Sequence, residues 1–459
     1  MQPAYLSSTI RAVETPMIEQ SPPDFLMKQA AAHLAGELSA LGGPTVFAVG
    51  GGGNGGDGLY AASILHSQGH DVEVVLIHPE GKAHPPAMAA YPGPIVTTPS
   101  WTNYVLVDAI QGLGSAPMDA RTAALWGRLA ASARRVVSVD IPTGIDADTG
   151  AGDGVRADLS VTFGGLRVAH ALSNNCGTVR CHDISDAAGT ALSAALRAHE
   201  AATQYVDLAD GVAFPLPSLE PRVEDNKYAG VAGVVAGSPK YPGAAVLATY
   251  AAVQATSAMV RYVGPCSSEV LAWAPEVVAT ESFGEAGRCQ AWVYGPGVSR
   301  HEASLMETEL PLLIDASGLG FITPSDLSRR SAPTLITPHA GEYEALFGTQ
   351  PVTEAAQETG TYILRKGRRT VIAAPDGFTW NINIGNSWLA TPGSGDVLAG
   401  ILGAYGARWG EWSLATIARG VQVHAVAAKL SAQTEFGEAP TSASRIARFI
   451  PAATAYCTS

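Results

Sequence analysis

The sequence predicts two α/β domains joined in tandem, on the strength of three observations. The first is length, because 459 residues exceed what one hydrophobic core ordinarily supports. The second is an alternation of short apolar runs with helical stretches in both halves, which is typical of parallel sheets covered on both faces. The third is a pair of glycine-rich turns, Val49–Gly58 and Thr391–Gly400, each placed before a predicted helix. We therefore expect a doubly wound first domain and a separate second α/β domain.

The first half contains five apolar runs that are expected to form strands, with helices between them. Several of these runs are apolar on both faces, which favours a buried parallel sheet. An amphipathic segment with Ile10, Val13 and Met17 precedes them, and the whole domain is expected to span residues 1–205. The amphipathic segment continues over Phe25–Leu41. The expected strands are Thr45–Val49, Asp71–Ile77, Tyr104–Ala109, Arg135–Asp140 and Leu159–Phe163, and the expected helices include Gly58–Gln68 and Asp119–Ser132.

The segment 206–221 is interpreted as a linker, because Pro215, Pro217 and Pro221 stand there among acidic residues. The second domain is expected over residues 222–459. Its motif order and spacing differ from those of the first half, so we do not interpret it as a duplication. Its expected strands are Gly230–Ala236, Ala291–Tyr294, Leu312–Asp315, Thr334–Ile336 and Thr370–Ala374, and its expected helices are Ala244–Met259, Val397–Tyr405 and Ala415–Leu430.

Composition excludes several classes of protein. The net charge is −13 and no cluster of Lys and Arg exceeds short pairs, so duplex nucleic acid is not an expected partner. The five cysteines are odd in number and contain no C-x-x-C pair, which is typical of reduced thiols in a cytoplasmic protein. No stretch approaches the roughly 18 apolar residues of a membrane span, and the N-terminus does not resemble a signal peptide. We expect a soluble cytoplasmic protein without a membrane partner.

The first glycine-rich turn, VGGGGNGGDG, is expected to bind phosphate. Such a turn exposes a row of backbone N–H groups, and the start of the following helix adds the positive end of its dipole. Gly50, Gly52 and Gly55 also satisfy G-x-G-x-x-G, which is weak evidence in so glycine-rich a run. A dinucleotide-binding dehydrogenase would need an acidic residue at the end of the second strand, where only Glu80 is near. The turn therefore predicts phosphate binding, and the missing acidic residue disfavours a dinucleotide-binding dehydrogenase.

Polar residues end three other strands of the predicted sheet. Asp108 ends one strand, Asp140 and Thr143 follow another, and Phe163 stands at the end of a third. Because the carboxyl ends of parallel strands line one crevice, these residues and the glycine turn are expected to converge. The alternative is that Asp108 and Asp140 only cap the turns that follow them.

Four segments in this order, GGGGNGGDG, DAIQGLG, DIPTGIDADTG and ADLSVTFGG, resemble the N-terminal domain of the NAD(P)H-hydrate repair enzymes, the NAD(P)HX epimerase. The resemblance covers roughly residues 1–205 and implies a Rossmann-like domain that interconverts the R and S epimers of NAD(P)HX. It implies proton transfer by Asp140 at the hydrated nicotinamide carbon. It also implies a potassium ion on Asn54, Asp108 and Thr143, whose oxygen atoms suit such a cation. The residues that it implies for substrate binding are Gly53, Asn54, Gly55, Gly56, Asp57, Gly112, Leu113, Gly114 and Asp140.

Two positions depart from that family's pattern. Gly53 stands where an asparagine is usual, which would loosen a contact of the turn. Arg167 stands where a lysine is common, which keeps the positive charge but changes its geometry.

The second glycine-rich turn, TPGSGDVLAG, places an acid beside an anion site. Gly393, Ser394 and Gly395 precede a helix and would bind a phosphoryl group, with Asp396 next to them as a base. Phosphoryl transfer needs this arrangement, because its catalysis rests mainly on positioning and charge neutralisation. The alternative is an ordinary N-cap aspartate with glycines for a tight turn.

This turn and the segments VVAGSPKYPGAAVLA, PEVV, VYGPGVS, LLIDASGL, LITPHAGEYEALFG and RKGRRTVIAAPDG resemble the C-terminal domain of the same enzymes, the ADP-dependent NAD(P)HX dehydratase. The resemblance covers about residues 222–457 and implies a ribokinase-like fold, with ADP as co-substrate accompanied by Mg²⁺. It implies that Asp396 deprotonates the hydrate hydroxyl, which receives the terminal phosphoryl group of ADP and then leaves as phosphate. The implied hydrate-binding residues are Ala244, Gly297, His339 and Asp396, and the implied nucleotide-binding residues are Lys366, Gly367, Arg368, Arg369, Thr370 and Gly395.

Two further positions in this half are ambiguous or unusual. His339 could instead begin a helix, with Glu342 completing a capping box from Thr337 or Pro338 onward. Pro392 replaces a usual glycine, which stiffens the approach to the turn but leaves the later amides free.

Together the two resemblances imply a bifunctional enzyme that returns hydrated NADH and NADPH to use, with release of AMP and phosphate. Both domain types are compatible with a homo-oligomer. One alternative is a small-molecule kinase of the ribokinase-like fold, which leaves the first half without a purpose. The other is a first domain that serves only as a nucleotide-sensing or partner-binding scaffold, against which the joint presence of Asn54, Asp57, Asp108 and Asp140 argues.

Overall fold

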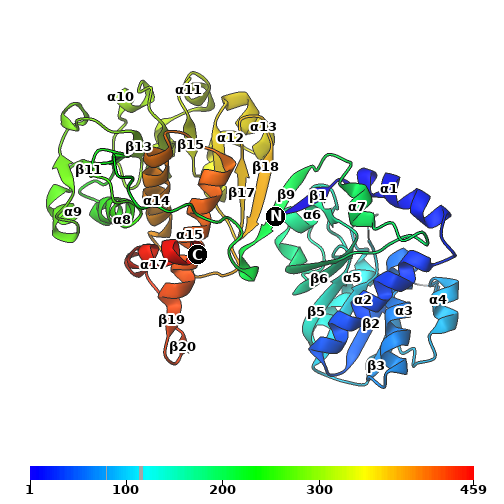
Figure 1. Cartoon of the computed structure of the whole chain (residues 1–459). Helices are drawn as coiled ribbons and strands as arrows, with labels where there is room; N and C mark the ends of the chain where they lie inside the picture. Colours follow the sequence, from blue (N-terminus) through cyan, green and yellow to red (C-terminus); the bar gives the residue numbers. More distant parts are fainter. Residues whose placement is uncertain (79, 113–116, 459) are drawn as a thin grey trace. The chain divides into compact units, whose positions relative to one another are not determined.

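A computed structural model describes residues 1–78, 80–112 and 117–458 of the chain (Figure 1). The chain divides into two compact units, one over Gln2–Tyr205 and the other over Val206–Ser459 with Met1. All five cysteines are free thiols. Within the described ranges, no helix combines the length and the apolar character needed to cross a membrane.

The first unit is built on a six-stranded sheet in the order β3-β2-β4-β5-β6-β8, and every neighbouring pair in it is parallel. The five predicted strands are confirmed, with their ends shifted by at most two residues. The chain passes from β3 to the far side of β2 to form β4, so a crevice is expected at the carboxyl ends of β2 and β4. The strands are β2 (Thr45–Val49), β3 (Val72–Leu76), β4 (Tyr104–Ala109), β5 (Ala133–Val139), β6 (Leu159–Phe163) and β8 (Thr178–His182).

Helices cover both faces of this sheet. Phe47 and Val49 of β2 pack in one core with residues of α2 and α3, whereas Val46 and Ala48 pack in another with Trp126 of α5. This alternation follows from the side-chain period of a strand, and it confirms the predicted doubly wound fold. The helices are α1 (Ser7–Glu19), α2 (Phe25–Leu41), α3 (Gly53–Ser67), α4 (Pro85–Ala90), α5 (Ala120–Ala130), α6 (Val168–Leu172) and α7 (Leu192–Leu196).

Short strands that the sequence did not predict lie apart from this sheet. β1 (Gln2–Tyr5) pairs in parallel with β7 (Leu166–Arg167) and antiparallel with β9 (Thr203–Asp207). The pairing ties the beginning of the first unit to its end.

The second unit is a larger sheet in the order β12-β11-β10-β13-β14-β15-β16-β17-β18. Its strands are parallel as far as β16, and the last three form antiparallel pairs. The five predicted strands are confirmed, but β11, β12, β16 and β18 were not predicted. The strands are β10 (Ala232–Val235), β11 (Val260–Val263), β12 (Val278–Thr280), β13 (Ala291–Tyr294), β14 (Leu312–Ile314), β15 (Thr334–Ile336), β16 (Tyr362–Arg365), β17 (Arg369–Ala373) and β18 (Thr379–Asn383).

Two helices of this unit pack unusually closely, because small residues meet between them. A Cβ atom added at Gly400 of α14 would lie 2.2 Å from the carbonyl oxygen of Ala248 in α8. A side chain at this position would therefore push α14 away from α8. The helices are α8 (Pro242–Gln254), α9 (Ser267–Trp273), α10 (Ala303–Met306), α11 (Pro324–Ser328), α12 (Ala340–Phe347), α13 (Val352–Thr359), α14 (Ser394–Trp409), α15 (Leu414–Ala432), α16 (Ala443–Arg448) and α17 (Ile450–Thr458).

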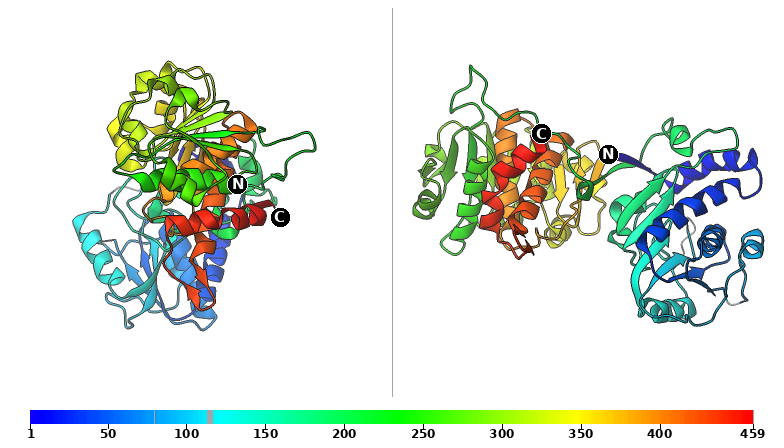
Figure 2. Two further views of the ribbon diagram at one scale, coloured as in Figure 1. Left: turned by 90° about the vertical axis from the view of Figure 1, so that its left-hand side faces the viewer. Right: turned by 60° about the horizontal axis from the view of Figure 1, so that its bottom comes forward.

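A small hairpin, β19 (Gln433–Thr434) and β20 (Gly437–Glu438), follows α15 and projects from the second unit (Figure 2). Phe436 at its tip is almost fully exposed.

The predicted linker is packed against the second unit rather than free of it. Phe214 is buried and stacks on Trp380, with ring centroids 5.3 Å apart. Gln422 of α15 is also buried, and its Oε1 accepts hydrogen bonds from the backbone N–H groups of Ala213 and Phe214 at 2.7 and 2.9 Å. Its Nε2 donates to the carbonyl of Phe214 at 2.8 Å. One side-chain amide thus satisfies three backbone groups of a segment that has no regular structure.

We expect Gln422→Leu to release this segment from the second unit. The substitution keeps an apolar body but leaves three backbone groups buried without partners, each at a cost of about 1–3 kcal/mol. Hydrogen exchange at the amides of Ala213 and Phe214 should then accelerate at least about tenfold. Gln433→Leu, in the exposed hairpin, is the matched control and should leave these amides unchanged. Fast exchange of the same amides in the unaltered chain would contradict the packing described above.

Candidate functional site

A cavity of about 1060 Å³ opens at the carboxyl edge of the first sheet. The turn after β2 lines it with Gly53 and Asn54, and the loop after β4 lines it with Gly112. Asp57 of α3 and Asp140 after β5 complete this part of the wall. Residues up to 87 positions apart in the sequence (53 to 140) therefore converge at the predicted crevice.

The predicted phosphate-binding turn is shorter than expected, because α3 begins at Gly53 and not at Gly58. The first bond of the helix runs from the N–H of Gly56 to the carbonyl of Gly52 at 3.1 Å. Helix geometry leaves the N–H groups before Gly56 without partners within the helix, and these groups stand at the cavity. The first turn of α3 therefore presents both its amides and its dipole to this space.

Two of the expected substrate-binding glycines serve packing instead of lining the cavity. Gly55 and Gly56 are buried in α3. A Cβ atom at Gly55 would lie 2.0 Å from the carbonyl oxygen of Gly50, and one at Gly56 would lie 2.6 Å from Sδ of Met27. Only glycine allows the chain to turn this tightly from β2 into α3. Leu113 and Gly114 lie outside the described residues.

Gly53 itself is exposed, and a Cβ atom added there would have no neighbour within 4 Å. The asparagine that is usual at this position would therefore have room. With glycine in place of that asparagine, this part of the cavity wall is open.

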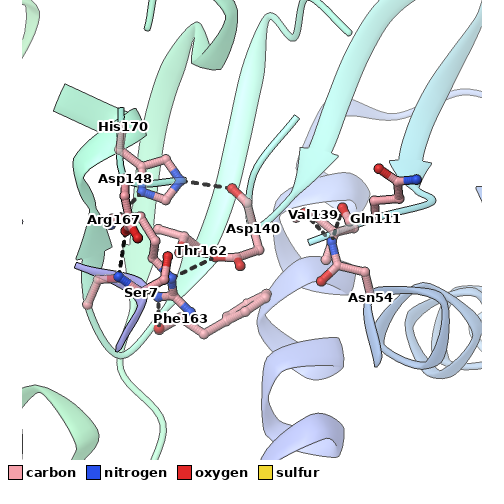
Figure 3. Close-up of polar contacts among 11 residues, drawn as sticks. Ser7, Asn54, Gln111, Val139, Asp140, Asp148, Thr162, Phe163, Arg167 and His170 are labelled. Atoms are coloured by element: carbon pink, nitrogen blue, oxygen red, sulfur yellow. Dashed lines mark hydrogen bonds and ion pairs between the residues drawn. The ribbon is translucent and has the colours of Figure 1, made fainter. Parts of the chain in front are cut away.

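The three expected potassium ligands belong to one hydrogen-bonded network. Thr143 donates to Asp108 twice, through Oγ1 at 2.7 Å and through its backbone N–H at 2.8 Å. Its Oγ1 also accepts from the N–H of Gln111 at 3.2 Å. Nδ2 of Asn54 donates to the carbonyls of Gln111 and Val139 at 2.8 and 2.7 Å (Figure 3). Carboxylate, hydroxyl, amide and carbonyl oxygens are thus gathered directly beside the cavity wall.

Asp108 and Thr143 are fully buried and do not line the cavity. Burial raises the pKa of Asp108 to about 6, although hydrogen bonds from Thr143 oppose the increase. Oδ1 of Asp108 also accepts from the N–H of Ile110 at 3.4 Å, so the capping alternative holds for this residue in part. Within the described ranges, no three His, Cys, Asp or Glu side chains form a metal-binding group.

Asp140 does not act as a cap. Its Oδ1 accepts a hydrogen bond from Oγ1 of Thr162 at 2.8 Å, and Nε of Arg167 lies 3.5 Å from the same oxygen (Figure 3). Its backbone is left-handed, with φ at 61°, which costs about 1–3 kcal/mol for a residue with a side chain. Such strain persists only where neighbouring groups hold it, and it is concentrated at functional sites.

The guanidinium group of Arg167 contacts both the Asp140 carboxylate and nearby backbone carbonyls. Its Nη1 donates to the carbonyls of Phe163 and Gly165 at 3.2 and 2.6 Å, while Nε faces Asp140. A lysine ammonium could not reach these groups in the same fixed fork. The departure from the family pattern therefore adds rigidity on this side of the cavity.

Five acids line the cavity, and Glu14, Asp24 and Asp119 among them were not predicted from the sequence. Glu14 of α1 lines the same space as Asp57 and Asp140. Burial raises the pKa of Asp57 well above its ordinary range, and the charges of Asp140 and Glu14 raise it further. Burial also raises the pKa of Glu14, with Arg167 opposing. A carboxyl whose pKa is raised in this way thus stands in the same cavity as Asp140, which suits acid–base chemistry.

In the second unit, Asp396 lies in the first turn of α14. This helix begins at Ser394, earlier than the predicted Val397, and its N-cap is Gly393 in a left-handed conformation with φ at 83°. The N-cap alternative for Asp396 is therefore wrong, because a glycine occupies that position. The carboxylate is free to face a ligand at the helix N-terminus.

A buried ion pair stands beside this helix N-terminus. Nζ of Lys366, after β16, donates to Oδ1 of Asp315 at 2.6 Å, and Asp315 is 1% exposed. A Cβ atom at Gly395 would lie 3.4 Å from Nζ of Lys366 and 3.9 Å from Oδ2 of Asp315. The ends of β14 and β16 and the start of α14 therefore meet at one point. Asp315 was not among the predicted site residues, although its position at the end of a strand was a usable signal.

Burial raises the pKa of Asp396 to about 7, and the charge of Asp315 adds to this effect. Lys366 opposes the increase because it stabilises the ionised carboxylate. An acid with this pKa can accept a proton near neutral pH, as a general base must.

His339 is shown to be a helix N-cap. Its Nδ1 accepts from the N–H groups of Gly341 and Glu342 at 3.0 and 3.2 Å. Oε2 of Glu342 accepts from the N–H of His339 at 2.8 Å and completes a capping box. The box begins at His339 and not at Thr337 or Pro338, as the sequence had suggested. The ring is otherwise exposed, so capping leaves a face of it available to a ligand.

The other residues predicted in this half fall into two places. Ala244 and Gly297 adjoin each other, because a Cβ atom at Gly297 would lie 2.7 Å from that of Ala244. Within Lys366–Thr370, Lys366 reaches Asp315, whereas Gly367 and Arg368 are exposed and Arg369 and Thr370 are buried in β17. The structure therefore brings only Lys366 of this segment to the start of α14.

Features near Ala244 and Gly297 indicate space for a ligand. A cavity of about 370 Å³ includes Gly237 and Val298 at the carboxyl ends of β10 and β13. The buried hydroxyls of Ser238 and Thr337, at the ends of β10 and β15, have no hydrogen-bond partner among the described residues. Buried hydroxyls are ordinarily paired, so unpaired ones at strand ends are expected where a ligand completes the site.

Comparison with known proteins matches each unit to a sequence family. Residues 23–169 match the family described as YjeF-related protein N-terminus, and residues 232–451 match the family described as NAD(P)H-hydrate dehydratase. A solved structure of the ADP/ATP-dependent NAD(P)H-hydrate dehydratase from Bacillus subtilis, co-crystallised with ATP and Mg²⁺, is 26% identical. That match covers 52% of this chain and 93% of that chain, with a TM-score of 0.45.

Relatives that span both units give the stronger finding. The bifunctional NAD(P)H-hydrate repair enzyme Nnr of Corynebacterium glutamicum is 38% identical, over 99% of this chain and 99% of that protein. The protein of the same description from Mycobacterium tuberculosis is 42% identical, over 88% of this chain and 89% of its own length. Because the likeness runs through both units, the chain belongs to the family of bifunctional NAD(P)H-hydrate repair enzymes.

Proposed function

We propose that this chain repairs hydrated NADH and NADPH with two active sites. The first interconverts the R and S epimers of the hydrate, and the second dehydrates the S epimer with ADP. The observation that carries the proposal is common to both units, where an acid, buried in the case of Asp140 and partly buried in the case of Asp396, stands beside the N-terminus of a glycine-led helix. Asp140 stands with α3 at the large cavity, and Asp396, with a pKa of about 7, stands in α14.

In the first unit, the N–H groups at the start of α3 hold the phosphates of the hydrate. The nicotinamide end then reaches Asp140, whose carboxylate accepts a proton from the hydrated carbon centre. Burial and the charges of Asp140 and Glu14 raise the pKa of Asp57 well above its ordinary range, so Asp57 is the group that returns a proton. Two carboxyl groups at one cavity suit a reaction that removes a proton on one side and returns one on the other.

A potassium ion would be held by Asn54, Asp108 and Thr143. Their oxygen atoms are the hard donors that such a cation prefers, and the carbonyls of Gln111 and Val139 stand with them. The ion would supply a fixed positive charge near the phosphates and the first turn of α3. Because the pKa of Asp108 is about 6, its protonation below that pH would weaken binding of a cation there.

In the second unit, the start of α14 and Lys366 hold the phosphates of ADP. Asp396 takes the proton of the hydrate hydroxyl, whose oxygen then attacks the terminal phosphorus of ADP. This bond forms as the bond to AMP breaks. The new phosphate ester leaves the ring as inorganic phosphate, and loss of a ring proton restores the double bond of NADH or NADPH. Mg²⁺ would arrive on the ADP phosphates, since the described residues offer no acid cluster for it.

The kinase alternative predicts a different product. A kinase accumulates a stable phosphorylated alcohol, whereas the proposed reaction releases phosphate and the reduced nucleotide. The match of residues 23–169 to a separate family and the relatives that span both units favour the repair enzyme. We also propose that the protein acts in the cytoplasm, where its substrates and reduced thiols are found.

A mixture of both hydrate epimers with ADP tests the first site through Asp140→Asn. The unaltered chain should convert the whole mixture to NADH, followed by absorbance. The isosteric amide cannot accept a proton, so this variant should stop at the fraction that is the S epimer. Complete conversion by Asp140→Asn at the rate of the unaltered chain would contradict the role of Asp140. The second site provides the internal control, because its rate on the S epimer should not change.

Asp396→Asn in the same assay tests the second site. Loss of the base should lower kcat for recovery of NADH by about 10²–10⁴-fold. ADP binding should persist, since the amides of α14 and Lys366 remain. Chiral separation of the residual hydrates should still show epimers interconverting in this variant. Normal recovery of NADH by Asp396→Asn would exclude this aspartate as the base.

The dehydratase rate should also depend on pH in a defined direction. Asp396 must be ionised to act, and its pKa is about 7, so the rate should fall as the pH is lowered through 7. Asp315→Asn removes a charge that raises this pKa, so the acid limb should move to lower pH. Asp376→Asn, in an exposed turn, is the matched control and should leave the profile in place. A shift to higher pH in Asp315→Asn would contradict the assigned charge effect.

A further inference from the structure

The main chain of Asp140 is held at several points. It is one of only four described residues other than glycine with a positive φ, at 61°. Its N–H donates to the carbonyl of Val161 in β6 at 2.8 Å, and its side chain accepts from Thr162 at 2.8 Å. The remaining backbone group, its carbonyl oxygen, lies 2.8 Å from Nε2 of His170. A conformation disfavoured for a residue with a side chain is therefore fixed by contacts from two directions.

His170 can make this contact in one protonation pattern only. Its Nδ1 lies 3.0 Å from the backbone N of Arg167, whose N–H can only donate. Nδ1 is therefore an acceptor, and Nε2 carries the proton that is donated to the carbonyl of Asp140. The ring is fully buried in α6 and bridges the backbone of Arg167 to that of Asp140 (Figure 3).

The same bridge fixes the cation that faces Asp140. The guanidinium of Arg167 is bonded to the carbonyls of Phe163 and Gly165, and its Nε lies 3.5 Å from the Asp140 carboxylate. The bridge through His170 thus sets the distance between the backbones of Arg167 and Asp140, whose side chains form this ion pair. Removing it would free the Asp140 peptide to relax toward negative φ and would turn the carboxylate away from its present direction.

We propose that His170 is a positioning residue for the first active site. It holds the Asp140 peptide in the left-handed conformation and so aims the carboxylate into the cavity. His170 does not line that cavity, so it acts through Asp140 and not on the substrate. This inference rests on the proposed epimerase activity.

Two substitutions separate the contacts of His170. In His170→Asn the amide oxygen can still accept from Arg167, but the side chain is too short to donate to the carbonyl of Asp140. In His170→Gln the amide nitrogen can reach that carbonyl, whereas the acceptor for Arg167 is lost. Comparing the two variants therefore shows whether the hydrogen bond to the carbonyl of Asp140 is required, or only a buried polar side chain at position 170.

The expected result is a fall in kcat of epimerisation in His170→Asn and its rescue in His170→Gln. Misaiming the carboxylate by about 1 Å should lower kcat about 10–100-fold in the Asn variant, with KM for the hydrate unchanged. The Gln variant should retain most of the unaltered kcat. Dehydratase activity of the second unit, measured on the same samples, should be equal in all three proteins.

Non-additivity provides a second test. In an Asp140→Asn background, His170→Asn should cause no further loss, because the group that it positions no longer acts. A further loss of similar size would show that His170 works independently of Asp140 and would overturn the inference.

Other outcomes also decide the question. Equal losses in the Asn and Gln variants, or a rise in KM without a change in kcat, would overturn the positioning role. If His170→Asn fails to fold, His170→Gln decides the question alone. A loss of epimerisation kcat equal to that in Asp140→Asn would refute the inference, and a retained kcat would support it. Absence of epimerisation in the unaltered chain would instead refute the proposed function, and the positioning role with it.

Discussion

Burial of carboxyl groups beside the N-terminus of a helix is the constraint on which both units depend. Taking a carboxylate out of water raises its pKa, and this effect is the largest for Asp57, Asp108 and Asp396. The fold offsets the cost by local means, with hydrogen bonds from Thr143 to Asp108 and with the Lys366 ammonium near Asp396. As a result, Asp108 and Asp396 have pKa values of about 6 and about 7, and Asp396 can exchange a proton near neutral pH.

Parallel sheet topology explains why the main residues of the first site could be predicted from the sequence. The runs Thr45–Val49, Tyr104–Ala109 and Leu159–Phe163 consist mainly of apolar residues and are buried along their whole length, and their predicted limits agree with the structure. Residues that follow such runs must meet at the carboxyl edge of the sheet. This rule is enough to place Asp140, which follows β5, at the crevice.

Features that arise from packing could not be predicted in this way. Both glycine-led helices begin earlier than expected, at Gly53 and Ser394, because glycine has a low helix propensity and tertiary contacts decide its conformation. Of the antiparallel strands at the end of the second sheet, β17 was predicted, whereas β16 and β18 are short and contain polar residues, so they were not. Glu14 and the pairing of Asp315 with Lys366 depend on which elements become neighbours, and no local pattern carries that information.

The two acids are positioned by different physical means, and this difference predicts how each site responds to change. Asp140 occupies a strained backbone conformation that hydrogen bonds from His170 and Thr162 hold in place. Asp396 lies in a regular helix, and neighbouring charges adjust its pKa. The first site should therefore be sensitive to neutral substitutions that alter packing around α6 and β6. The second should tolerate such changes better but respond to any change of charge, because a Coulomb interaction acts over several ångströms whereas a hydrogen bond fails within one.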